Sequence, residues 1–210
     1  MSKNIRMTSR LPSGSRGLAL AAALLLAGAS GGPAVAQTAL SGTEIVNTMN
    51  SAARAAPPGL SAALIRQAVQ QHMIDNPGTP ITWKPLELLD NLAQVNVQIQ
   101  FALNSAIIRP ESYATIGSIA DALHHPVLGG YKFVVTGNTD TTGNRKDNLA
   151  LSQARADAVV EALTTTYHVD PARVEAVGLG QESLQDVKNP KNPINRRVQL
   201  INIGKYLPGK

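Results

Sequence analysis

One arginine in the second half of the chain occupies a position that is expected to face a core. On a helical wheel of 100° per residue, Arg155 falls in the same sector as Val159 and Leu163, within a helix expected over residues 148–167. The opposite sector holds solvent-compatible residues such as Asp157, so an outward position was available for the guanidinium. An inward-pointing guanidinium needs a partner, because a buried unpaired charge is strongly unfavourable.

Asp140 is the natural partner, because it follows an expected strand in the loop that leads into the same helix. Two interpretations remain open. The first is a structural ion pair between Asp140 and Arg155. The second is a receptor for a zwitterion, in which the planar guanidinium meets a carboxylate, the aspartate meets an ammonium, and free backbone amides at the helix start favour the anion.

A metal site in this loop is not expected. Asn138, Asp140, Thr142 and Gly143 match positions 1, 3, 5 and 6 of a calcium-binding EF-hand loop, but Leu149 stands at position 12, where a bidentate glutamate is needed.

Enzymatic chemistry is not expected either. The four histidines are scattered without metal-ligand spacing, and the chain has no G-x-S-x-G nucleophile motif. Glu182 and Asp186 could act as an acid/base pair on glycans, but their polar, proline-flanked loop predicts that both are exposed to solvent. Residues 178–180 (Gly-Leu-Gly) begin a dinucleotide-binding pattern without its third glycine, and they predict a turn. We therefore expect no cofactor.

Alternating strands and helices begin near residue 92. Period-two alternation predicts a strand over 95–101, and further segments predict these elements: a helix over 111–123, a strand over 131–135, the helix over 148–167, and strands over 174–177 and 197–203. This β-α-β-α-β-β order predicts an α/β (α+β) two-layer sandwich over residues 91–204, with helices on one face of a mixed four-stranded sheet. We expect residues 205–210 to form a tail.

A small helical region is expected over residues 37–90. A capping box at residues 41–44 opens one helix, and residues 61–74 predict a second. The sequence leaves the purpose of this region open.

The first 36 residues have the pattern of a secretory signal peptide. Four basic residues precede a 13-residue apolar run at 17–29, and Ala-Val-Ala at 34–36 offers a cleavage site. The run is shorter than the ~18 residues that span a bilayer, so we expect cleavage and no membrane span afterwards. The alternative is an uncut anchor.

Charge and cysteine content exclude other classes. Residues 1–36 hold four of the 19 basic residues and none of the 14 acidic ones, which leaves 15 against 14 in the remainder. This near-neutral balance gives no support to nucleic-acid binding. The chain has no cysteine, so it can form neither a disulfide nor a lipid-modified cysteine.

Residues 136–156 (TGNTDTTGNRKDNLALSQARA) resemble the signature of the OmpA-like peptidoglycan-binding domain family. In that signature a strand ends in G-H-T-D, an asparagine follows eight residues after the aspartate, and L-S-x-x-R-A comes next. The Gly-Leu-Gly at 178–180, the Asn-Arg-Arg-Val at 195–198, and Phe101 with Ser105 fit the same family. The resemblance covers about residues 92–204.

The resemblance implies that Asp140 and Arg155 grip diaminopimelate, the stem-peptide residue of the cell wall whose free end carries both an ammonium and a carboxylate. Asn148 matches the family's asparagine and is equally a candidate helix N-cap. Asn138 replaces the common histidine, and its amide can still form hydrogen bonds.

Two further contacts are candidates: Arg196, which can equally brace the last strand, and Asn104, at the first strand end.

We expect a non-enzymatic protein that binds peptidoglycan non-covalently in the periplasm of a Gram-negative-type bacterium, close to the outer or inner membrane. The alternatives are a membrane-anchored protein that links the inner membrane to the wall, and a wall-acting enzyme. Proton-driven work is not expected, because residues 17–29 contain no acidic side chain.

Overall fold

The computed structural model describes residues 40–51, 56–57, 59–78, 86–89 and 91–206. The expected signal peptide and its cleavage site lie outside these residues. Residues 37–210 form one compact unit. Within the described part of the chain, no helix combines the length and the hydropathy that a membrane span requires.

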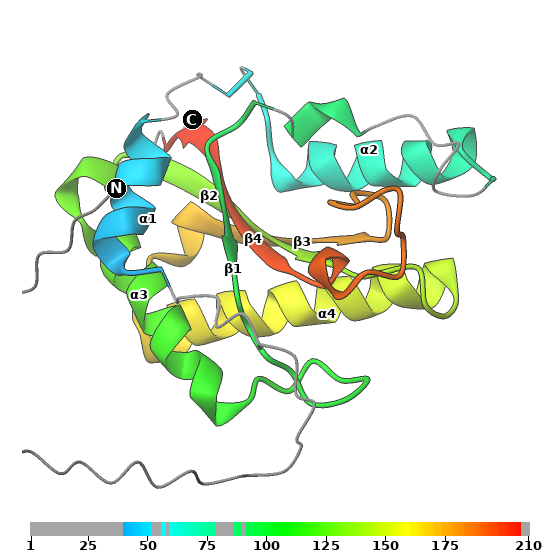
Figure 1. Cartoon of the computed structure of the whole chain (residues 1–210). Helices are drawn as coiled ribbons and strands as arrows, with labels where there is room; N and C mark the ends of the chain where they lie inside the picture. The colour runs from blue at the N-terminus through cyan, green and yellow to red at the C-terminus, as the bar shows by residue number, and fades with distance from the viewer. Residues whose placement is uncertain (1–39, 52–55, 58, 79–85, 90, 207–210) are drawn as a thin grey trace, which may run out of the picture. The chain divides into compact units, whose positions relative to one another are not determined.

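A mixed four-stranded sheet forms the centre of this unit (Figure 1). Its strands are β1 (Gln94–Val97), β2 (Tyr131–Asn138), β3 (Val174–Gly180) and β4 (Val198–Lys205). The spatial order is β1-β4-β2-β3, in which β4 runs antiparallel to both of its neighbours and β2 pairs with β3 in parallel. The expected fold class is therefore confirmed, including the order β-α-β-α-β-β.

Two helices cover one face of the sheet, as expected: α3 (Tyr113–His124) and α4 (Arg145–Glu161). They enclose a hydrophobic core whose largest fully buried members include Ile116, Ile119, Leu123, Phe133 and Leu163. A π-helical turn, Ala162–Thr166, extends α4 toward Tyr167.

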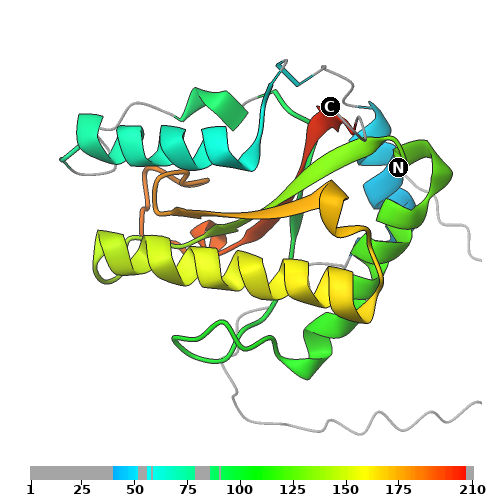
Figure 2. The ribbon, with the colours of Figure 1, turned by 180° about the vertical axis from the view of Figure 1, so that it is seen from behind.

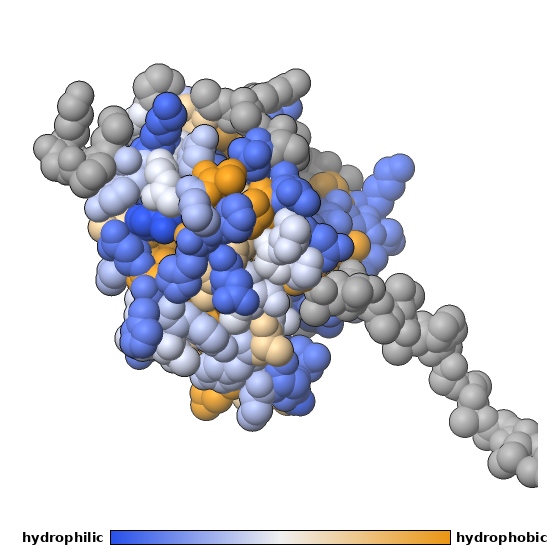
Figure 3. All heavy atoms as spheres, turned by 90° about the vertical axis from the view of Figure 1, so that its left-hand side faces the viewer, coloured by the Kyte–Doolittle hydropathy of each residue, from blue (hydrophilic) through white to orange (hydrophobic). Residues whose placement is uncertain are grey.

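The N-terminal helices complete the unit on both sides. A reciprocal Ser41–Glu44 capping box opens α1 (Gly42–Ser51), as expected. This helix adds Ile45 and Met49 to the core beside α3. On the face that presents α1 and α3, hydrophobic side chains form only small groups among hydrophilic ones (Figure 3).

The second N-terminal helix, α2 (Ala62–Asp75), lies on the opposite face of the sheet (Figures 1 and 2). The Ser61 hydroxyl caps its first turn. A second core lies beneath it and includes Ile65, Val69, Leu179 and Ile201. The region of unknown purpose thus supplies one helix to each face of the sheet.

Three local expectations are wrong. The first strand ends at Val97, and Phe101 pairs only through an isolated bridge with Ile108. Helix α4 begins at Arg145 and is capped by Asn144, three residues before the expected start. Residues 178–180 lie in β3 and do not form a turn.

Glycine is required where α4 crosses the sheet. A Cβ at Gly137 would lie 2.1 Å from the carbonyl oxygen of Ser152, and a Cβ at Gly178 would lie 2.5 Å from the backbone nitrogen of Gln153. The helix backbone therefore packs directly on β2 and β3. The Ser152 hydroxyl accepts a hydrogen bond from the backbone N–H of Gly180 at 2.8 Å, which joins the helix to the end of β3.

We predict that Gly137→Ala lowers the free energy of unfolding by about 1–3 kcal/mol or more, because the added methyl group pushes α4 off the sheet. Chemical denaturation measures the effect. Gly130→Ala is the matched control, since a Cβ there meets no atom within 4 Å. Equal stability of the two variants would contradict the close packing.

Candidate functional site

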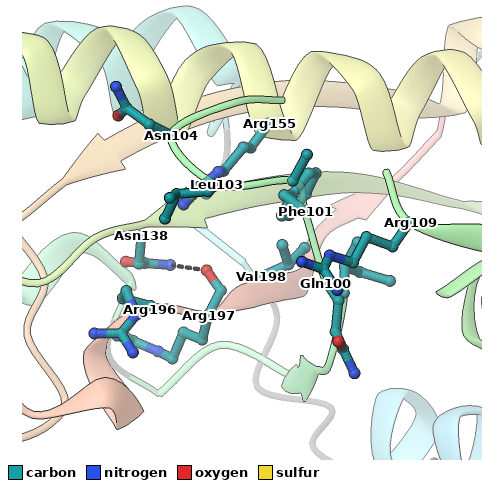
Figure 4. A pocket seen from close by; sticks show the side chains of 13 residues that line it. Gln100, Phe101, Leu103, Asn104, Arg109, Asn138, Arg155, Arg196, Arg197 and Val198 are labelled. Atoms are coloured by element: carbon teal, nitrogen blue, oxygen red, sulfur yellow. Dashed lines mark hydrogen bonds between the residues drawn. The ribbon is translucent and has the colours of Figure 1, made fainter. Parts of the chain in front are cut away.

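A pocket of about 410 Å³ lies at one end of the sheet, between the β1–α3 connection, the end of β2 and the start of β4 (Figure 4). It is lined by Ile99, Gln100, Phe101, Ala102, Leu103, Asn104, Arg109, Gly137, Asn138, Arg155, Arg196, Arg197 and Val198. Four of these residues are arginines, and none is acidic. Four of the six expected site residues meet here: Asn104, Asn138, Arg155 and Arg196.

Arg155 reaches this pocket from the inward face of α4, as the helical wheel predicts. Its Nε donates a hydrogen bond to the carbonyl oxygen of Ser105 at 3.0 Å, and its guanidinium lies 5.0 Å from the centre of the Phe101 ring. Within the described residues, no ion pair involves Arg155. The expected alternative of a structural Asp140–Arg155 ion pair is therefore wrong, and the two Nη groups remain available.

Burial lowers the pKa of Arg155, and the positive charge of Arg196 adds to this effect, while the negative charge of Asp140 opposes it. The three charged groups thus influence one another across the site. An arginine keeps its proton throughout the physiological range. The pocket therefore presents a half-buried, permanent cation.

Asp140 is 5% exposed and does not line the pocket, although it follows the lining residue Asn138 by two positions. Its Oδ2 accepts a hydrogen bond from Arg196 Nη1 at 2.5 Å, and its Oδ1 accepts one from the backbone N–H of Thr142 at 2.7 Å. Burial acts to raise the pKa of Asp140, but the hydrogen bonds from Arg196 and Thr142 outweigh it, so the pKa lies below its ordinary value. The carboxylate is held ionised.

Arg196, a candidate ligand contact from the sequence, is the partner of Asp140, and the sequence does not predict this pairing. The two residues are 56 positions apart and meet only because β4 begins beside the end of β2. The Arg196 side chain is 49% exposed, and the same residue lines the pocket. Arg196 therefore contacts the buried Asp140 carboxylate and also faces the open pocket.

Asn148 organises the loop and does not line the pocket. Its buried Nδ2 donates to the carbonyl oxygens of Asp140 and Thr142, both at 3.1 Å, and to Gln181 Oε1 at 2.8 Å. The N-cap interpretation of Asn148 is wrong, because the Asn144 side chain caps the helix. Asn148 holds the backbone that presents Asp140.

The two remaining asparagines lie on the pocket wall. Asn138 is 3% exposed and donates through Nδ2 to Gln199 Oε1 at 3.2 Å, whereas its buried Oδ1 has no hydrogen-bond partner in the described part of the protein. Asn104 is exposed and adopts a left-handed backbone, with φ of 49°. Asparagine tolerates that conformation better than most residues.

The expectation that Glu182 and Asp186 are both exposed to solvent is wrong for Glu182. Glu182 is 4% exposed, and it accepts hydrogen bonds from Arg145 Nε at 2.7 Å and lies 2.9 Å from His72 Nδ1. Helix α2 covers this carboxylate, which the sequence places in an exposed loop. Asp186 accepts hydrogen bonds from Asn189 and so closes a turn. Among the described residues, no group of three or more metal-ligating side chains is present.

Comparison with known proteins gives one consistent family. Residues 100–198 match the OmpA family. Outer membrane protein Omp38 of Acinetobacter baumannii is 33% identical over 122 residues, which are 57% of this chain and 33% of that protein. The peptidoglycan-associated lipoprotein of Pseudomonas putida is 34% identical over 102 residues, which are 48% of this chain and 59% of that protein.

A solved structure is also similar. The peptidoglycan-associated lipoprotein from Burkholderia pseudomallei shares 33% identity, with 50% of this chain and 87% of that chain covered, at a TM-score of 0.41. The chain spans about a third of the length of the Omp38 protein that it matches.

We predict that Arg196→Ala raises the pKa of Asp140, because burial persists after the hydrogen bond and the positive charge are removed. In the wild type, the stabilisation from ionised Asp140 is present above about pH 4 and disappears as the pH falls through the lower folded-state pKa. Carboxyl-carbon NMR titration measures this pKa. Arg109→Ala is the control, since Arg109 pairs with Glu111. An unchanged Asp140 pKa in Arg196→Ala would contradict the pairing.

Proposed function

We propose that this chain, whose residues 100–198 form a domain of the OmpA family, binds peptidoglycan non-covalently and thereby tethers itself to the cell wall. Two of its relatives are named peptidoglycan-associated lipoproteins, and these names support the proposal of peptidoglycan binding. The proposed site is the arginine-lined pocket, and the proposed target is the diaminopimelate residue of the stem peptide.

The observation that carries the proposal is the state of Arg155. Its guanidinium is half-buried at the pocket, is fixed by Ser105 and Phe101, and has no carboxylate partner among the described residues. A desolvated guanidinium held in this way favours an incoming carboxylate, because charge-assisted bidentate hydrogen bonds then replace those lost to water.

The ligand's ammonium is assigned to Asp140. In the unliganded protein, Arg196 occupies this carboxylate, and the exposed Arg196 side chain has room to swing away. On binding, the ammonium takes the place of Arg196 on Asp140, and Arg196 turns with Arg155 toward the ligand carboxylate. The exchange keeps Asp140 paired throughout, so no buried charge is left uncompensated.

The asparagines have separate roles in this proposal. Asn148 holds the Asp140 loop, and Asn104 lines the pocket. Asn138 offers an acceptor, Oδ1, that has no hydrogen-bond partner among the described residues. A zwitterionic end-group fits this combination of charges and amides better than a purely anionic ligand does.

The proposed location is the periplasm of a Gram-negative-type bacterium, in association with the wall and close to one of the two membranes. In this proposal, residues 1–36 of the chain supply the export signal. The proposed role is binding rather than catalysis. Glu182, one of the two carboxylates considered as an acid/base pair, is buried against Arg145 and His72.

We predict that Arg155→Lys and Asp140→Asn each reduce co-sedimentation with diaminopimelate-type peptidoglycan about tenfold or more, while the fold survives. Lysine at position 155 keeps the positive charge but lacks the planar guanidinium that forms two parallel hydrogen bonds to a carboxylate. Asparagine at position 140 removes the negative charge that pairs with the ligand ammonium. Thermal melting of each variant checks the fold. Arg109→Lys makes the same substitution at another arginine of the pocket and should bind as the wild type does. Wild-type binding by folded Arg155→Lys and Asp140→Asn would overturn the proposal.

We also predict a modest affinity for a single soluble stem peptide, roughly millimolar to micromolar, since only a few charge-assisted contacts are available. Calorimetry measures it. Retention on whole wall is stronger because the ligand repeats along the polymer. A nanomolar constant for free diaminopimelate, or equal retention on lysine-type wall, would contradict this account.

A further inference from the structure

A second pocket, of about 320 Å³, lies on the sheet face that carries α2. It is lined by Leu89, Gln94, Asn96, Ser183, Leu184, Gln185, Arg197 and Gln199. Side chains alternate between the two faces of a strand, and Gln199 stands two residues before Ile201, which packs in the core beneath α2. This pocket therefore opens on the opposite face from α3 and α4. It shares only Arg197 with the first pocket.

In the described part of the chain, no carboxylate pairs with the positive charge that Arg197 brings to this pocket. Its Nη2 donates to the carbonyl oxygen of Ser183 at 2.9 Å and to Gln199 Oε1 at 3.2 Å. Its Nε is buried and has no hydrogen-bond partner within the described chain, and no described carboxylate forms an ion pair with it. Burial lowers the pKa of Arg197 to about 10. A cation in this state is stabilised by an anion from outside.

The rest of the wall offers amides and a hydroxyl. Gln199 Nε2 donates to Gln94 Oε1 at 3.1 Å, which orients both amides. In the described structure, no hydrogen bond engages the side chains of Asn96, Ser183 and Gln185. Amides and hydroxyls both donate and accept, so they match the hydroxyl groups of a polyol. Two of the eight lining residues, Leu89 and Leu184, are apolar, and the other six are polar or charged.

We propose that this second pocket binds a small sugar acid, with the ligand carboxylate on Arg197 and its hydroxyl groups on the amides of Gln94, Asn96 and Gln185. A neutral sugar lacks the group that Arg197 requires, and a simple anion leaves the amides unused. The proposal does not rest on the peptidoglycan function. Arg197 lines both pockets, but Asp140, Arg155 and Arg196, which are assigned to the stem peptide, do not line this one.

NMR titration of the full chain with D-glucuronate tests the proposal, with D-glucose as the probe that lacks the carboxylate. We expect glucuronate to shift the amide signals of residues 94–96, 183–185 and 197–199, with a dissociation constant in roughly the millimolar range. Glucose should bind about tenfold more weakly or not at all, because it cannot form the charge-assisted contact.

Asn96→Asp supplies the variant test. Asn96 is exposed, so the fold should persist, while the new negative charge should weaken glucuronate binding about fivefold or more through repulsion. Asn104→Asp makes the same change at the first pocket and should leave the glucuronate titration unaltered. Asp140→Asn, which disables the proposed peptidoglycan site, should also leave it unaltered.

Three outcomes would overturn the proposal: no shifts at these residues with millimolar glucuronate, equal binding of glucose and glucuronate, or wild-type glucuronate binding by folded Asn96→Asp. In each case Arg197 and the surrounding amides serve only to brace the β3–β4 connection. Wall binding is measured separately, so a failure of this proposal is distinct from a failure of the peptidoglycan proposal.

Discussion

The contact of the α4 backbone with strands β2 and β3 organises the rest of the structure. Because Gly137 and Gly178 carry no side chain, the helix lies directly against the sheet at the level of Ser152 and Gln153. One turn further along, this arrangement delivers Arg155 to the pocket, and one turn earlier it delivers Asn148 to the Asp140 loop. A helix held farther from the sheet would carry both side chains out of the site.

The charged side chains of the pocket leave a position for the charges of the proposed ligand. Asp140 is buried and paired with Arg196. Among the described residues, the half-buried guanidinium of Arg155 contacts a carbonyl oxygen and an aromatic ring but no carboxylate. The site therefore has a stable unliganded state with an excess of positive charge. A zwitterion offers the protein one new partner for each sign of charge, and the exposed side chain of Arg196 allows the exchange of partners. Under the proposed function, this arrangement gives reversible, modest binding that is strengthened by repetition along a polymer.

Much of this arrangement is predictable from local sequence patterns. Hydrophobic periodicity predicts the order of strands and helices, and the helical wheel predicts the inward position of Arg155, because both depend on spacing within one element. The pairing of Asp140 with Arg196 is not predictable in this way, since it is made by segments 56 residues apart. The burial of Glu182 is missed for the same reason, because His72 lies 110 residues away. The Gly-Leu-Gly at 178–180 suggests a turn, although its first glycine serves close helix packing.

A crystal structure of the chain with a diaminopimelate-containing stem peptide tests the central claim most directly. The account predicts that the ligand carboxylate lies on the Nη groups of Arg155, that the ammonium lies on Asp140, and that Arg196 has left that carboxylate. A bound peptide that leaves the Asp140–Arg196 pair intact and makes no contact with Arg155 would contradict it.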